Sequence, residues 1–207
     1  MKVGKWELNQ ENMLKVIKCI PFIGAIFNVA NFYANSGVLS KRKQIAAFED
    51  WWRRILVGML FTLVLSLGVV VFFNDGLFNP VSNPTGLDAP SVALSIFPSI
   101  LGFGIGVFVV VFALPNQFIE KINLIKTNGR NRTFGASLMV VDMAYPLMIY
   151  AMVLMGEFLL KIFQINLFTQ VLSVFLLLYG MLMTFDLISL VFMTAYALLA
   201  AQASKKT

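Results

Sequence analysis

Four long apolar runs constrain this chain of 207 residues more than any other feature of its sequence. Residues 55–73 and 92–114 carry no charge, residues 135–156 carry only Asp142, and residues 167–201 carry only Asp186. A membrane-spanning helix needs about 20 mostly apolar residues. We therefore predict an all-α integral membrane protein with four transmembrane helices over these ranges.

The distribution of basic residues predicts how the spans are oriented. Nine Lys and Arg precede the first span, four lie in the loop 115–134 and two in the tail 204–207, which places 15 of the 16 on one side of the membrane. The remaining one, Lys161, lies in the loop before the fourth span. By the positive-inside rule the basic side is cytoplasmic. Both termini are accordingly predicted to be cytoplasmic.

Three parts of the chain follow from this topology. Residues 1–54 form a cytoplasmic or interfacial N-terminal segment, residues 55–203 the transmembrane domain and residues 204–207 a tail. Within the first part, residues 19–40 are uncharged, but Pro21 and three asparagines dilute their hydrophobicity. They are predicted to be an interfacial or re-entrant helix, with a fifth span or packing against cytoplasmic helices as alternatives.

Basic residues beside the predicted spans form a candidate contact surface on the cytoplasmic side. Such residues bind anionic lipid headgroups, each with about 1 kcal/mol. They also suit docking of a cytoplasmic protein, and the two roles are compatible. No nucleic-acid-binding module is recognisable, so direct nucleic-acid binding is not expected. The residues are Lys41, Arg42, Lys43, Arg53, Arg54, Lys121, Lys126, Arg130 and Arg132.

Small residues recur at helical spacing in the first two spans. Small residues on one face let a second helix approach closely within a membrane. We expect helix-packing seams here, either within one subunit or between subunits of a homo-oligomer. The seams comprise Ser95, Ser99, Gly102 and Gly106 in the second span, and Gly58, Thr62 and Ser66 in the first.

Two aspartates lie inside the spans, Asp142 with Tyr145 one turn later and Asp186 with Ser189 one turn later. A charge at this depth is costly and usually faces a bundle interior or a cavity. Three interpretations compete: a structural role, with each acid protonated or paired with a tyrosine, serine or inner arginine; a cation or proton path; and a catalytic aspartate pair. The motif of intramembrane aspartyl proteases is absent, which disfavours the third.

A further acidic residue, Glu157, lies at the outer end of the third span, four residues before Lys161. Oppositely charged residues at this spacing are neighbours on a helix surface. We therefore expect Glu157 and Lys161 to form a surface pair.

The composition argues against catalysis. The chain has no histidine and one cysteine, Cys19, which excludes His-dependent nucleophilic catalysis, thiolate metal clusters and intrachain disulfides. No cofactor or metal is expected. The sequence favours a non-enzymatic membrane scaffold or sensor that homo-oligomerises and docks a cytoplasmic effector protein. The alternative is a small ion or proton channel or transporter subunit that uses Asp142 and Asp186.

In length, four spans, cytoplasmic termini and lack of catalytic residues, the whole chain resembles the transmembrane subunit of Kiwa-type bacterial anti-phage systems. No diagnostic motif carries this resemblance, so no functional residue is transferred from that family. The resemblance implies a multi-pass protein of the bacterial inner membrane that acts in antiviral defence as a homo-oligomeric sensor with a cytoplasmic effector partner.

Overall fold

The computed structural model describes residues 22–37, 44–73, 88–113, 136–162 and 166–203, and these contain helices and no strand. Four of the helices are long and apolar enough to cross a membrane, which confirms the predicted fold class. In chain order the elements are α2 (Ile23–Ala34), α3 (Phe48–Trp51), the π-helical turn η2 (Trp52–Leu56), α4 (Val57–Phe73), α5 (Ala89–Phe112), α7 (Ala136–Ile162) and α8 (Leu167–Ala203).

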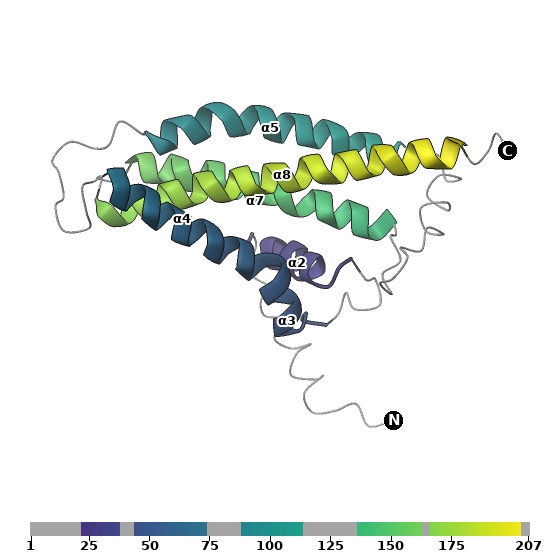
Figure 1. Ribbon diagram of the computed structural model, residues 1–207, viewed down its shortest axis with the longest axis horizontal. Helices are drawn as coiled ribbons and strands as arrows, with labels where there is room; N and C mark the ends of the chain where they lie inside the picture. The colour runs from purple at the N-terminus through teal and green to yellow at the C-terminus, as the bar shows by residue number, and fades with distance from the viewer. Residues whose placement is uncertain (1–21, 38–43, 74–87, 114–135, 163–165, 204–207) are drawn as a thin grey trace, which may run out of the picture.

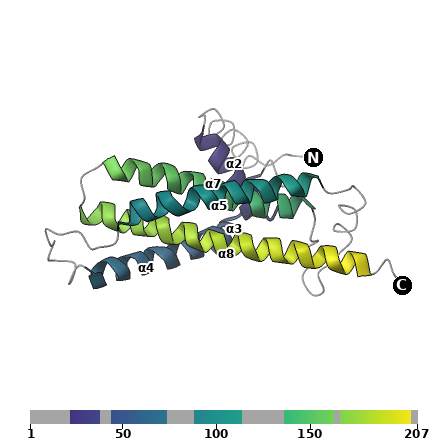
Figure 2. The ribbon, with the colours of Figure 1, turned by 90° about the horizontal axis from the view of Figure 1, so that it is seen from above.

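The long helices α5, α7 and α8 run side by side, and α4 lies along one part of α8 (Figures 1 and 2). Adjacent long helices alternate in direction along the chain. We call the end at which α5 and α8 begin the outer end and the opposite end the inner end, following the predicted topology. The helices α5, α7 and α8 continue toward the inner end past the point where α4 begins (Figure 1).

The bundle is held together by large buried side chains that fit against glycines. Phe97 of α5 is fully buried and stacks on Tyr150 of α7, with ring centroids 5.7 Å apart. A Cβ added at Gly180 of α8 would lie 2.5 Å from the Phe97 ring. Gly104 of α5 leaves similar room for Leu147 of α7. These contacts let three helices pack closely where hydrophobic burial alone gives little driving force.

The helix α7 is longer than the sequence predicted, because it continues to Ile162 instead of ending at 156. Gly156 does not break it: a Cβ there would lie 2.9 Å from Leu176 of α8, so the glycine permits a close helix contact. Prolines at Pro98 in α5 and Pro146 in α7 are also accommodated inside continuous helices, as membrane bundles tolerate.

The short helix α2 lies beside the bundle, close to α7 and to the start of the first span (Figure 2). Its 12 residues extend about 18 Å, too little to cross a bilayer. Asn31 donates to the Gln44 carbonyl at 2.9 Å and accepts from the Ala46 amide at 2.8 Å. Two of the three asparagines, Asn31 and Asn35, therefore fasten α2 to the residues that lead into α3. The helix α2 by itself is too short to be the fifth span that was an alternative for residues 19–40.

Candidate functional site

Arg54 occupies the centre of a polar junction at the inner end of the first span. It belongs to η2, where the backbone follows a π-helical turn before it continues as α4. Such turns are rare and often mark functional positions. The preceding residue, Arg53, is exposed, whereas the Arg54 side chain retains only 18% of its accessible surface. Two adjacent arginines of the predicted basic surface are thus in different environments.

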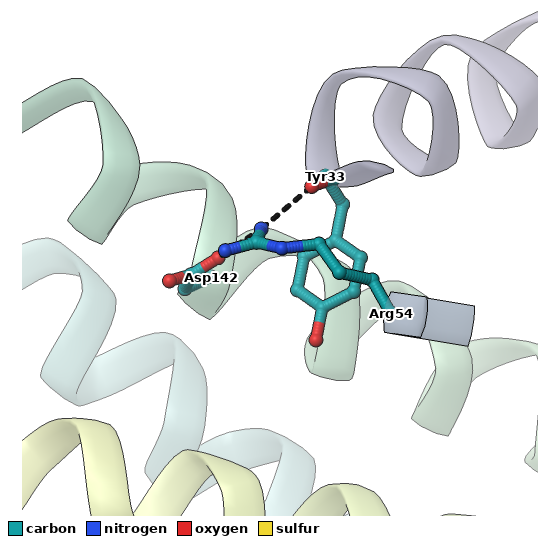
Figure 3. A network of polar contacts seen from close by, with 3 residues as sticks. All are labelled: Tyr33, Arg54 and Asp142. Carbon is teal, nitrogen blue, oxygen red and sulfur yellow. Dashed lines mark hydrogen bonds and ion pairs between the residues drawn. The ribbon is translucent and has the colours of Figure 1, made fainter. Parts of the chain in front are cut away.

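The Arg54 guanidinium contacts two other elements (Figure 3). Its Nη1 atom lies 3.3 Å from Oδ1 of Asp142 in α7 and forms an ion pair with it. The same atom donates to the backbone carbonyl of Tyr33 at 2.7 Å, and the guanidinium lies 5.1 Å from the centre of the Tyr33 ring. An arginine suits this position because its planar group both donates hydrogen bonds and stacks on aromatic faces. We call Tyr33, Arg54 and Asp142 the inner junction.

Aromatic residues extend the inner junction from α2 into the bundle. The Tyr33 ring stacks on Tyr145 of α7, with centroids 4.1 Å apart and planes inclined by 9°. The hydroxyl of Tyr145 shares a 2.8 Å hydrogen bond with the hydroxyl of Tyr179 in α8. One turn beyond, Tyr150 donates to Thr184 at 3.2 Å. These contacts link α2 to α7 and α7 to α8.

Asp186 lies at nearly the same depth as Arg54. Gly58 of α4 packs against Leu182 of α8, and the two helices run in opposite directions. Arg54 precedes Gly58 by four residues and Asp186 follows Leu182 by four, so both lie about 6 Å nearer the inner end. The negative charges of Asp142 and Asp186 add to the effect of burial, which raises the pKa of the Tyr33 phenol above its usual range.

Although Asp186 is near the junction, its side chain is exposed, as is Ser189. Both continue the helix face of Leu182 that α4 covers, and they lie toward the inner end, where the segment before α4 turns away from α8 (Figure 1). We expected both acids to face the interior of the bundle. Asp142 does so and is paired with Arg54, whereas Asp186 is exposed in the single subunit.

The two predicted seams of small residues have different surroundings. Gly58, Thr62 and Ser66 face the bundle: Thr62 and Ser66 are buried, and their hydroxyls donate to carbonyls of their own helix, Gly58 and Leu63 among them. Ser95, Ser99, Gly102 and Gly106 are all exposed on α5, and no side chain of another described residue comes within 4 Å of a Cβ added at either glycine. The first seam packs within the subunit, and the second faces outward.

The remaining predicted basic residues lie outside the described residues: Lys41, Arg42, Lys43, Lys121, Lys126, Arg130 and Arg132. The predicted pair of Glu157 and Lys161 is not formed. Glu157 is fully buried and accepts a hydrogen bond from Ser173, whereas Lys161 donates to Ser91 at the start of α5 at 3.0 Å. The prediction was wrong because the two side chains have partners on different helices: Glu157 faces Ser173 of α8, and Lys161 reaches Ser91 of α5.

Sequence reasoning also missed Tyr33 and Tyr179 as members of the network around Asp142. Their hydrogen bonds join residues more than 20 positions apart in sequence, so no local spacing indicated them. Within the described ranges, no group of three or more Asp, Glu, Cys and His side chains is arranged to hold a metal ion. The chemistry that the inner junction supports is charge neutralisation and mechanical linkage between α2 and the bundle.

Comparison of the chain with known protein families, with curated proteins and with solved structures gave no match.

Proposed function

We propose that this protein is a non-enzymatic scaffold or sensor of the bacterial inner membrane, with both termini in the cytoplasm. In this proposal it homo-oligomerises and docks a soluble effector protein through its basic cytoplasmic segments, which also contact anionic lipid. Its resemblance to the transmembrane subunit of Kiwa-type systems makes phage defence the proposed biological setting.

The observation that carries the proposal is that Asp142 forms an ion pair with Arg54. Its charge is neutralised by Arg54, which in turn holds the Tyr33 backbone of α2. A carboxylate that forms an ion pair with an arginine is less suited to pass cations than a free one. The same contacts connect the bundle to the N-terminal helix, which is the connection a membrane sensor needs to signal to a cytoplasmic partner.

The outward seam on α5 provides the proposed oligomer contact. Gly102 and Gly106 lie one turn apart with open space around them, as in helix pairs that associate through small residues.

The test of this oligomer contact is the mass of the purified protein in mild detergent, measured by light scattering. Wild type is expected to be an oligomer, and Gly102→Leu with Gly106→Leu to be a monomer. Gly68→Leu on α4, which is also surrounded by open space, is the control and should remain oligomeric. A monomeric wild type would contradict this part of the proposal.

Partner docking is tested by freeing α2 from the bundle. Arg54→Met removes the contacts with Asp142 and Tyr33, whereas Arg53→Met changes only an exposed neighbour. Cytoplasmic proteins that co-purify with wild type are identified after chemical cross-linking. They should be depleted with Arg54→Met and retained with Arg53→Met. Equal recovery with both variants, or no specific protein with wild type, counts against docking.

A channel or transporter subunit remains the second candidate, and the exposure of Asp186 and Ser189 favours it. Both face outward from α8, where neighbouring subunits could enclose them. Ion flux into vesicles is measured for wild type, Asp186→Asn and Asp142→Asn. This candidate predicts flux that falls strongly in Asp186→Asn. Absence of flux, or flux unaffected by both changes, eliminates it.

A further inference from the structure

Glu157 is an acidic residue that the network at the inner end does not use. It lies near the outer end of α7, and none of its surface is accessible. Its Oε2 atom accepts a hydrogen bond of 2.6 Å from the Ser173 hydroxyl of α8. Its Oε1 atom is also buried and has no hydrogen-bond partner among the described residues.

Among the described residues, the charged groups near Glu157 are engaged elsewhere. Lys161, one turn later on α7, is exposed and donates to Ser91 of α5. Asp88, just before α5, is also exposed and accepts from the Ser91 amide, and the hydrogen bonds from Ser91 hold the pKa of Asp88 below its usual range. The described part of α4 carries no titratable side chain, and Ser173 is the polar residue that faces Glu157 from α8.

The two protonation states of Glu157 differ in how well this environment satisfies them. An ionised carboxylate would leave a negatively charged oxygen buried without a donor, which is strongly unfavourable within a membrane span. A neutral acid can place its proton on Oε2 and donate to the Ser173 hydroxyl, which can donate in turn to a carbonyl of its own helix. Oε1 is then an uncharged carbonyl oxygen, and an unpaired acceptor of that kind costs much less.

We propose that Glu157 and Ser173 form a proton-binding site at the outer end of the bundle, occupied at neutral pH. Glu157 binds the proton on its carboxyl group, and Ser173 accepts the resulting hydrogen bond. Nothing in this proposal depends on oligomerisation or on a cytoplasmic partner.

Infrared spectroscopy of protein labelled with ¹³C-glutamate tests the site directly, since the label separates Glu157 from Asp142 and Asp186. A protonated carboxyl absorbs apart from a carboxylate. Wild type should show a band of a protonated glutamate at neutral pH that disappears at alkaline pH. The band should be absent from Glu157→Gln and unchanged in Glu49→Gln, which alters an exposed residue. A wild type without the band, or a band that persists in Glu157→Gln, overturns the proposal.

The pH dependence of thermal stability provides a second readout that needs no labelling. A glutamate that binds its proton more tightly when folded than when unfolded contributes stability at low pH and loses it as the pH rises. Between about pH 5 and about pH 9, the melting temperature of wild type should therefore fall relative to that of Glu157→Gln. Parallel curves for the two proteins contradict the proposal. If Glu157→Gln does not fold, the wild-type infrared band and its loss at alkaline pH remain decisive.

Discussion

Asp142 and Glu157 lie on the same helix, α7, and their charges are accommodated in different ways. Asp142, near the inner end, forms an ion pair with Arg54 and keeps 24% of its side-chain surface accessible. Glu157, near the outer end, is completely buried and contacts the neutral hydroxyl of Ser173. One acid is met by a full positive charge from another element, and the other by a single uncharged donor.

The difference indicates two uses of a carboxyl group inside a membrane span. An ion pair ties two elements together, and it is costly to break because the surviving charge is left unpaired. A buried carboxyl without a cation is satisfied only as the neutral acid, so it can bind and release a proton. We therefore assign linkage to the inner end of α7 and proton binding to its outer end.

The largest effect is expected from removing the cation at the inner end. Arg54→Met should lower the free energy of unfolding by about 2–3 kcal/mol, because Asp142 loses its ion pair with Arg54. The estimate is below that for a fully buried pair, since both side chains retain some solvent access. Unfolding in detergent measures it. Arg53→Met is the control and should change stability by less than about 0.5 kcal/mol.

Replacing each of the two acids separately by its amide should distinguish their roles. Asp142→Asn is expected to lower the free energy of unfolding by about 1–2 kcal/mol, because it removes the charge that faces Arg54. Glu157→Gln should change it by less than about 0.5 kcal/mol at neutral pH, because a neutral side chain replaces a neutral acid. Equal losses in the two variants would remove the distinction between the two ends.

The hydrogen bond between the tyrosines next to the inner junction, Tyr145 and Tyr179, should contribute less to the free energy of unfolding. Tyr145→Phe leaves the buried hydroxyl of Tyr179 without its 2.8 Å partner and should cost about 1 kcal/mol. The matched change Tyr196→Phe affects an exposed tyrosine of α8 and should have no measurable effect. If the two variants melt alike, the hydrogen bond between α7 and α8 does not stabilise the bundle.

A smaller loss than at the tyrosines is expected at the outer end, where Asp88 caps α5. Asp88 accepts from the Ser91 amide at 3.2 Å, as helix N-cap residues do. Asp88→Ala should cost about 0.5–1 kcal/mol, whereas Asp88→Asn, which keeps an acceptor oxygen, should cost less. A thermal melt of both variants tests this, and an equal loss in both would show that the charge matters more than the cap.

The sequence predicted the fold well because apolar runs of membrane length have one favourable solution, the helix. The π-helical turn before α4 and the extension of α7 to Ile162 could not be predicted in this way. Both regions contact another helix: Arg54 pairs with Asp142 of α7, and Gly156 packs against Leu176 of α8. Such contacts are not encoded in local hydrophobicity.

The candidate site was predicted only in part. Its acids were evident, because a charge in an apolar run stands out, and pairing of an acid with an inner arginine was among the predicted alternatives. The choice of Arg54 for Asp142, the stacking of Tyr33 on Tyr145 and the burial of Glu157 depend on how the helices rotate against one another. That rotation results from packing across the whole bundle, and the sequence spacing of any one helix does not specify it.

A double-mutant cycle between Arg54 and Asp142 tests the central claim most directly. The free energy of unfolding is measured for wild type, Arg54→Met, Asp142→Asn and the double variant in the same detergent. If the pair links α7 to the first span, the double variant should be more stable than the sum of the single losses indicates, with a coupling energy of about 1–2 kcal/mol. A coupling energy near zero would show that Arg54 and Asp142 act independently and that the inner junction does not join these elements.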